Sequence, residues 1–377
     1  RILAFDFLTG HQRNYSVRHA YASILFILKD FRKSANEFQR AFTDSDGKYL
    51  PSLENLITTE LTLGLYNSAI NHLILLAHED PENLKALNKI VTLSVELDLD
   101  FKTLLRNEIS TEQRRRLNSN GQFLIHIAID AFIKGNHKRC RGALYQLAQV
   151  EYQGQYARTT ETVFQRAFSQ YLTKLLDENL TKKPSNKKVY VIGDSHTLSW
   201  KAASAGYSDT TYSFEPKICF GVKAFHLGSS DENPYKSMFI KQLTKLPDRS
   251  PVIVSAGEID CRDGDGIIPA ARKKAVCPSS LAKKTAIEFS KYLNSLSNTY
   301  QIAYTNVAYH DQVSNERRNV IKTFNSTLRE HCSIQCIDLE QISKSTPKNE
   351  FFLDPYHVRP QQMERAFILL LESKSFF

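Results

Sequence analysis

The chain has 377 residues, of which 42% are hydrophobic and 24% are charged. These proportions are typical of a globular protein that buries a substantial core, and this length predicts two or three domains. No apolar run approaches the roughly 18 residues that a membrane span requires, so we expect no membrane span. The formal net charge is +9, but the basic residues are scattered rather than clustered with aromatic residues, which argues against a nucleic-acid-binding protein.

The N-terminus and the cysteines indicate the compartment. Arg1–Phe7 is an interrupted apolar run that no small-residue cleavage site follows, so it is not typical of a signal peptide. None of the six cysteines forms a C-x-x-C pair, and no histidine cluster completes a zinc pattern. Cys261 and Cys277 could close a loop as a disulfide, but we prefer reduced cysteines in a cytoplasmic protein. We expect neither a metal nor a cofactor.

Residues 1–180 show a succession of helical patterns, and we predict that they form one helical domain. Within Leu50–Asn83, the residues Gly64, Ala69 and Pro81 have the spacing of two helices that approach closely and then end. This pattern resembles the tetratricopeptide repeat, whose period is about 34 residues.

Weaker copies of the repeat lie on both sides of this segment. The preceding copy has Lys29 at the glycine position, and a later copy has Gly135, which follows Gly64 by close to two periods. Lys85–Leu117, between them, fits the length of a repeat but not its signature. The resemblance implies a stack of helices. Such a stack would offer a concave surface to a protein partner, or it would be a scaffold that mediates packing or self-association, and we leave both open.

The polar segment Thr181–Lys188, which contains Pro184, marks the expected domain boundary. From residue 187 to 377 strand patterns alternate with helix patterns, which predicts an α/β domain with a parallel sheet and right-handed crossovers. Strands are expected at 189–193, within 213–227, and at 251–256, 300–308 and 335–339, and helices at 197–204, 235–246, 280–296, 316–331 and 361–373. Asp263–Pro278 is a polar insertion.

The first strand of this domain ends in a sequence that suits a nucleophile. Val189–Ile192 is apolar and rich in β-branched residues, as in a strand buried on both faces, and Gly193 permits a tight turn. Ser195 would then lie at the carboxyl end of a central strand, where open α/β sheets bind ligands. A nucleophilic serine also needs a base and a group that orients the base. Asp354 and His357 offer both in one short loop near the other end of the chain.

Together these residues resemble the SGNH hydrolase superfamily, also called GDSL-like esterases. That family has Gly-Asp-Ser after its first strand and Asp-x-x-His just before its last helix. The resemblance covers residues 187–377 and implies a three-layer α/β/α fold. It also implies that Ser195 is the nucleophile, that His357 is the general base and that Asp354 orients His357.

The oxyanion hole is where the chain departs from the family. The family places a glycine after its second strand, for which Gly228 is our candidate and Gly221 the competitor. After the third strand the family has an asparagine that donates a hydrogen bond, but Ile259 stands at that position and has no donor. We therefore expect a variant site in which Arg262, or else His196, supplies the missing positive group.

Several of these residues have simpler interpretations. Ser195 could merely cap the following helix, although the loop with Asp354 and His357 favours the nucleophile. Glu258 and Asp260 could be the paired carboxylates of a glycoside hydrolase. We prefer that Asp260 supports its loop and that Arg262 pairs with a carboxylate.

The function that the resemblance implies is that of a serine acyl-esterase. We expect an acylated carbohydrate as the substrate, from which the enzyme removes O-acyl groups such as acetyl. One alternative is an O-acyltransferase that uses the same triad on a polysaccharide. Another is a non-catalytic binding protein whose repeats recruit a partner, and Ile259 at the asparagine position is its best support.

Overall fold

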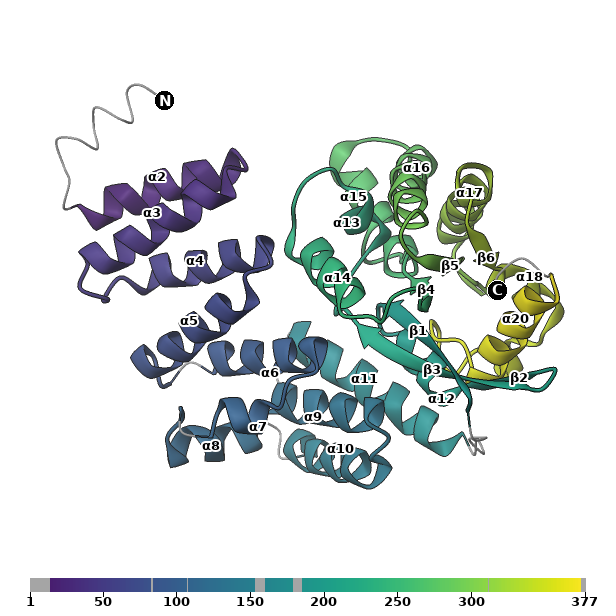
Figure 1. The fold of residues 1–377 in the computed structure, drawn as a ribbon, viewed down its shortest axis with the longest axis horizontal. Helices are drawn as coiled ribbons and strands as arrows, with labels where there is room; N and C mark the ends of the chain where they lie inside the picture. Colours follow the sequence, from purple (N-terminus) through teal and green to yellow (C-terminus); the bar gives the residue numbers. More distant parts are fainter. Residues whose placement is uncertain are drawn as a thin grey trace. The chain divides into compact units, whose positions relative to one another are not determined.

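The computed structural model describes residues 14–373 apart from 83, 107, 153–159, 179–184 and 311. Arg1–Phe7 and the Thr181–Pro184 part of the expected domain boundary lie outside the described residues. The chain divides into two compact units, of which the first contains the residues up to Phe123 together with Asp231–Met238. The second contains Leu124–Ser230 and Phe239–Phe377, so the sheet shares its unit with the last helices of the helical region (Figure 1).

The first unit is made of helices that pack on one another in chain order. Their ends carry local capping groups: the Asn14 side chain accepts hydrogen bonds from the amides of Ser16 and Val17, and Ser110 forms a capping box with Gln113. The helices are α2 (Tyr15–Ile27), α3 (Phe31–Asp44), α4 (Leu50–Thr62), α5 (Tyr66–Glu79), α6 (Lys85–Leu97), α7 (Phe101–Leu104) and α8 (Thr111–Asn118).

A left-handed turn recurs along the helical region. Lys29, Gly64, Asp98 and Gly135 have φ values of 63°, 72°, 55° and 72°. They follow one another at nearly equal intervals, each close to the period of about 34 residues that the resemblance implies. After each of them, the next amide bonds to a carbonyl of the preceding helix turn, which is the long hydrogen bond of a Schellman helix end. The stretch Lys85–Leu117, which matched the signature poorly, contains the same turn, with Asp98 in the place of glycine.

Six strands of the described residues form one sheet, in the order β2-β3-β1-β4-β5-β6. All neighbouring pairs are parallel except β2 and β3. The expected α/β alternation is thus confirmed with a mostly parallel sheet. The strands are β1 (Lys187–Gly193), β2 (Ser204–Tyr207), β3 (Thr210–Ile218), β4 (Pro251–Ser255), β5 (Gln301–Thr305) and β6 (Gln335–Ile337).

The expectation of a wholly parallel sheet is wrong at one edge. Tyr207 pairs with Thr210, so β2 and β3 form a hairpin with a two-residue turn. Ser208 occupies that turn with φ of 51°, a left-handed conformation that suits the twist of a tight hairpin. The helix expected at 197–204 ends earlier, at Ala202, because the chain turns into β2.

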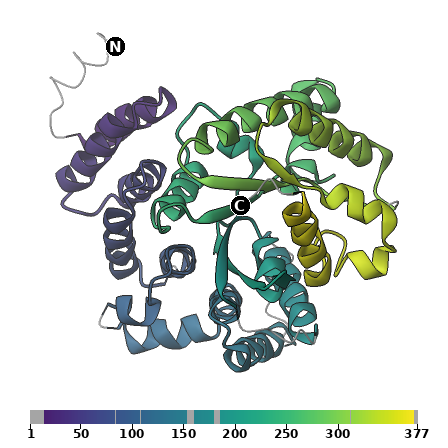
Figure 2. The ribbon, with the colours of Figure 1, turned by 45° about the vertical axis from the view of Figure 1, so that its right-hand side comes forward.

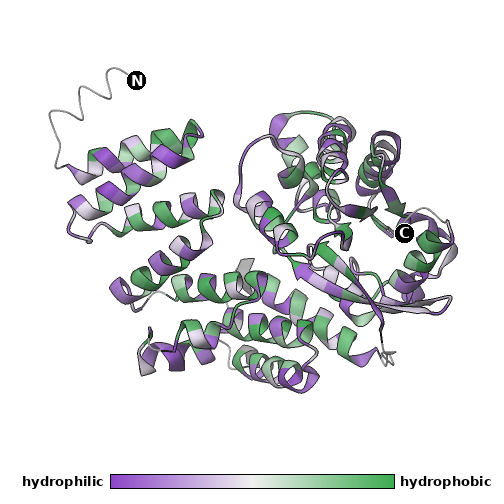
Figure 3. Ribbon diagram, viewed as in Figure 1, coloured by the Kyte–Doolittle hydropathy of each residue, from purple (hydrophilic) through white to green (hydrophobic). Residues whose placement is uncertain are grey.

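Helices cover both faces of the sheet. One face packs against α12 and α20 through a core that includes Val191, Ile253, Trp200 and Phe367, and Figures 1 and 2 place α16 and α17 on the opposite face. Apolar residues concentrate on the central strands (Figure 3). The helices are α9 (Gly121–Ile133), α10 (His137–Tyr152), α11 (Thr160–Asp177), α12 (Thr197–Ala202), α13 (Ala224–Gly228), α14 (Pro234–Thr244), α15 (Ile267–Lys274), α16 (Pro278–Leu296), α17 (Asn315–His331), α18 (Leu339–Ser345), α19 (Lys348–Phe351) and α20 (Pro360–Glu372), with a short 3-10 helix, η1 (Ile259–Cys261).

Two further expectations concern the chain as a whole. All six cysteines lie among the described residues and carry free thiols. Cys261 is buried and Cys277 is exposed, so the disulfide considered between them is not formed. No helix in the described part of the chain is both long enough and apolar enough to cross a membrane.

Candidate active site

The end of β1 positions Ser195. β1 lies between β3 and β4, and a Cβ atom at Gly193 would lie 1.8 Å from the carbonyl oxygen of Ser255 on β4. Only glycine therefore permits this close approach of the two strands. The Asp194 amide continues the contact by donating to the same Ser255 carbonyl, and α12 begins two residues after Ser195. Ser195 thus lies at the carboxyl edge of the sheet, as expected.

The structure brings Ser195, His357 and Asp354 together. The Ser195 Oγ lies 2.8 Å from His357 Nε2, and His357 Nδ1 lies 2.7 Å from Asp354 Oδ2. The other Asp354 oxygen accepts hydrogen bonds from the amides of Tyr356 and His357, each 2.8 Å long. The Leu353 amide donates to the His357 carbonyl and closes the loop. A serine, an imidazole and a carboxylate that are hydrogen-bonded in this order have the geometry of a Ser-His-Asp triad, in which the carboxylate orients the imidazole; we call this hydrogen-bonded set the relay.

The surroundings favour a neutral imidazole at His357. Burial lowers the pKa of His357 below its ordinary value, the Asp354 carboxylate opposes that shift, and the nearby positive charge of His196 adds to it. Burial by itself would raise the pKa of Asp354, but hydrogen bonds from the His357 ring and from the amides of His357 and Tyr356 hold this pKa well below its usual range. A neutral histidine and an ionised aspartate are the forms that a general base and its orienting partner need.

His196 is a fixed cation beside this relay. Its Nδ1 lies 3.0 Å from Asp194 Oδ1, and its Nε2 lies 3.0 Å from the carbonyl oxygen of Tyr356. Both partners only accept hydrogen bonds, so both ring nitrogens carry hydrogen and the ring is an imidazolium. Burial opposes this charge, but the Asp194 carboxylate raises the pKa of His196 to about 9. His196 thereby ties the serine turn to the loop that carries His357.

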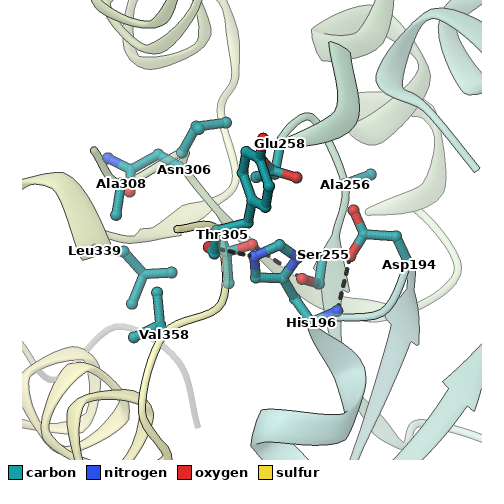
Figure 4. Close-up of a pocket in the computed structure, with 12 residues that line it drawn as sticks. Asp194, His196, Ser255, Ala256, Glu258, Thr305, Asn306, Ala308, Leu339 and Val358 are labelled. Atoms are coloured by element: carbon teal, nitrogen blue, oxygen red, sulfur yellow. Dashed lines mark hydrogen bonds and ion pairs between the residues drawn. The ribbon is translucent and has the colours of Figure 1, made fainter. Parts of the chain in front are cut away.

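A small cavity of about 20 Å³, enough for one water molecule, lies at the ends of β1, β4 and β5. Its lining includes Asp194, His196, Glu258, Thr305 and Tyr356. Figure 4 shows the Asp194–His196 pair at its edge, with Glu258 further across the site. Within the described residues, Asp194 Oδ2 has no hydrogen-bond partner. It can accept a hydrogen bond from a molecule that enters the cavity.

Arg262 and the nearby carboxylates have structural partners. Glu258 accepts a 2.7 Å hydrogen bond from Arg262 Nε and a 3.0 Å bond from Arg317 Nη2. The two guanidinium groups lie 4.5 and 5.0 Å from the ring centre of Tyr356, within range of cation–π attraction. Asp260 accepts from the first two amides of α13, and burial raises its pKa to about 7. The interpretation that Asp260 supports its loop and that Arg262 pairs with a carboxylate agrees with these contacts.

The residues expected to form the oxyanion hole differ in the donors and contacts that they have in the structure. Ile259 is buried at the start of η1 and offers no side-chain donor. Gly228 ends α13, and a Cβ atom there would lie 2.6 Å from the Phe289 amide of α16, so packing alone accounts for this glycine. Its oxyanion role, like that of Arg262, remains a prediction. Among the described residues the Ser195 amide takes part in no backbone hydrogen bond and is available as a donor.

Tyr171 on α11 is the site residue that the sequence did not indicate. Its ring is stacked on His357, with the ring centres 3.7 Å apart and the planes inclined by 12°. It lies upstream of the segment that resembles a known family, and no motif surrounds it. Ser199, whose hydroxyl bonds to Tyr171, was also missed. No local signal indicated it, because Ser195 precedes α12 and only Ser199 lies in that helix.

Within the described part of the chain, no group of three or more His, Cys, Asp or Glu side chains is placed to hold a metal ion. No protein-family model matches the chain, and no curated protein matches it either.

Proposed function

We propose that the sheet-containing part of the chain is an SGNH hydrolase-like domain and that the protein is a serine acyl-esterase. The observation that carries the proposal is the relay from Ser195 through His357 to Asp354, with hydrogen-bond distances of 2.8 and 2.7 Å. A serine that merely capped α12 would not need a buried histidine and a partly buried carboxylate aligned behind it.

In the proposed reaction, His357 Nε2 takes the proton of the Ser195 hydroxyl while Oγ attacks the carbonyl carbon of an ester. Asp354 stabilises the imidazolium that forms, and the Ser195 amide donates to the oxyanion. When the tetrahedral intermediate collapses, the ester C–O bond breaks and His357 returns the proton to the leaving alkoxide. A water molecule, deprotonated by His357, then attacks the acyl-serine. The bond between the acyl carbon and Ser195 Oγ breaks, the carboxylic acid leaves, and His357 returns the proton to Oγ.

The substrate class that we propose is an O-acylated carbohydrate, with acetyl as the acyl group. This choice follows from the resemblance of the motifs at Ser195 and Asp354–His357. The helical repeats would serve a protein partner or self-association, and the recurring turns at Lys29, Gly64, Asp98 and Gly135 support a tetratricopeptide-like arrangement.

The test is ester hydrolysis by the full chain, measured with p-nitrophenyl acetate and as acetate release from an acetylated polysaccharide. Wild type should hydrolyse both, and Ser195→Ala should lower kcat by at least about a thousandfold. An acetyl group that moves to a sugar hydroxyl faster than to water would identify an O-acyltransferase with the same triad.

One observation favours a second candidate, a non-catalytic binding protein. Ile259 removes the side-chain donor of the oxyanion hole, and losing such a donor commonly costs about 3 kcal/mol of transition-state stabilisation. A hydrolysis rate that is the same in wild type and Ser195→Ala would identify this candidate and reject the esterase.

A further inference from the structure

Helix α11 lies outside the strand-helix alternation of the α/β domain but belongs to the same compact unit as the triad. Tyr171 of this helix is fully buried, and its ring lies flat against the imidazole of His357 at 3.7 Å. The two hydrogen bonds of His357, to Asp354 and to Ser195, are made by its ring nitrogens, whose N–H groups and lone pairs point outward in the plane of the imidazole. They fix how the ring is rotated in its plane, whereas a stacked neighbour restrains how the plane is tilted.

The hydroxyl of Tyr171 is held as firmly as its ring. Ser199 Oγ donates a 2.6 Å hydrogen bond to the Val358 carbonyl, so its single hydrogen is engaged. The Tyr171 hydroxyl, 2.7 Å from Ser199 Oγ, must therefore be the donor of that contact. It also lies 3.4 Å from the Ser195 carbonyl oxygen. Ser199 thus joins the helix after the nucleophile to the residue that follows the base, and Tyr171 donates to that serine.

The same side of α11 holds the catalytic loop at two more points. Lys174 Nζ donates a 2.7 Å hydrogen bond to the Leu353 carbonyl, just before Asp354. Glu178, just beyond the helix, accepts from Gln361 at 2.6 Å and forms an ion pair with Arg359, just after His357. Positions 171, 174 and 178 have the i, i+3 and i, i+4 spacing of residues that share one face of a helix. Contacts on both sides of the loop and on the imidazole itself come from this one face.

We propose that Tyr171 is a positioning residue for His357 and that α11 is an integral part of the active site. The inference rests on the proposed function. When His357 takes the serine proton, the new imidazolium lies over the face of a tyrosine ring, where its positive charge is attracted by the π electrons. The ring also keeps water from that face of the base. Tyr171 touches neither the ester nor the reacting oxygen, so its effect should appear in kcat and not in KM.

The experiment compares Tyr171→Leu and Tyr171→Phe in the full chain with p-nitrophenyl acetate. Tyr171→Leu should lower kcat by about 10- to 100-fold with little change in KM, because small misplacements of a catalytic group cost that much. Tyr171→Phe keeps the stacked ring and should restore most of the rate. The matched control is Phe367→Leu, which removes a fully buried ring of the same unit that packs on Trp200, Tyr212 and Phe214 and should keep its kcat.

If Tyr171→Leu does not fold, Lys174→Met replaces it, since this side chain holds the catalytic loop from the same helix face and its loss should lower kcat several-fold. If Tyr171→Leu folds and its kcat is unchanged, the proposal is overturned. If Tyr171→Leu does not fold, an unchanged kcat in Lys174→Met overturns it. An equal loss of kcat in Tyr171→Leu and Phe367→Leu also overturns it.

A readout independent of activity separates this inference from the proposed function. In a protein with labelled histidines, the ring current of Tyr171 should shift the His357 Cε1 proton upfield, and His357→Gln assigns the signal. Tyr171→Leu should remove that shift, and Tyr171→Phe should keep it. If wild type hydrolyses no ester, the esterase assignment fails by itself. A His357 signal unaffected by Tyr171→Leu would show that the tyrosine does not position the imidazole.

Discussion

The fixed positive charge at His196 should set the pH at which the proposed base becomes active. The ring centres of His196 and His357 are 4.8 Å apart. At that distance, two unit charges repel by about 0.9 kcal/mol in the dielectric of water and by about 3.5 kcal/mol at an effective dielectric constant of 20. This repulsion disfavours the protonated form of His357, so it lowers the pKa of His357.

The perturbation is His196→Gln, which removes the charge and keeps a side-chain amide able to donate to the Tyr356 carbonyl. The acidic limb of kcat/KM for p-nitrophenyl acetate reports the pKa of the base in the free enzyme. His357 must be neutral to act, so kcat/KM rises with pH through that pKa. Without the neighbouring cation the pKa of His357 rises, and the acidic limb should move to higher pH.

The control is Lys201→Gln, which also removes one positive charge from α12, where Lys201 pairs with Glu215. Its acidic limb should stay within about 0.2 pH units of wild type, because solvent and salt screen a more distant charge. A limb that stays in place in His196→Gln, or that moves to lower pH, would refute a cationic His196 beside the base.

Three further predictions follow from the triad, the His196 ion pair and the recurring turn. Asp354→Asn should lower kcat about 10³- to 10⁴-fold in steady-state hydrolysis with nearly unchanged KM, because the amide no longer selects the required tautomer of His357, and a loss below tenfold would contradict its orienting role. The pKa of His196 rises on folding from 6.5 to about 9, so the pair contributes stability that is fully present below pH 6.5 and is lost as the pH rises through 9. That contribution amounts to about 3 kcal/mol of unfolding free energy, measured by urea unfolding as a function of pH. The loss of stability between pH 6.5 and 9 should be absent in His196→Gln, and the same loss in that variant would contradict the prediction. Lys29→Gly should raise the free energy of unfolding by about 1 kcal/mol, because the Lys29 backbone has a left-handed conformation that favours glycine. The control Lys33→Gly, inside α3, should lower the free energy of unfolding by a similar amount. An equal effect of the two substitutions would show that the backbone of Lys29 is not strained.

The parts of the site that the sequence predicted are those governed by local rules. The apolar strand before Gly193 and the tight turn into α12 follow from residues that are neighbours in the chain. Asp354 and His357 share one loop, so their contact is also local, and only the meeting of that loop with Ser195 needed the fold. The resemblance of the two motifs to a known family supplied this long-range step, because the loop follows α19 and not a strand, so the strand–helix alternation alone does not place it.

The parts that could not be predicted depend on partners far apart in sequence or on the backbone. His196 is an imidazolium because its second partner is the carbonyl of Tyr356, and a backbone carbonyl leaves no mark in the sequence. Tyr171 precedes the whole α/β alternation whereas His357 comes near its end, so nothing short of the tertiary packing of α11 pairs them. The regular spacing of the turns could not be predicted from the sequence at Asp98 and Lys29, since both residues adopt a left-handed conformation in which glycine is expected.

The most direct test of the central claim, that Ser195 is an activated nucleophile, is labelling with a fluorophosphonate probe followed by intact mass measurement. The account predicts one adduct on wild type and none on Ser195→Ala or His357→Ala. A well-folded wild type that takes no label, or a Ser195→Ala variant labelled like wild type, would contradict it.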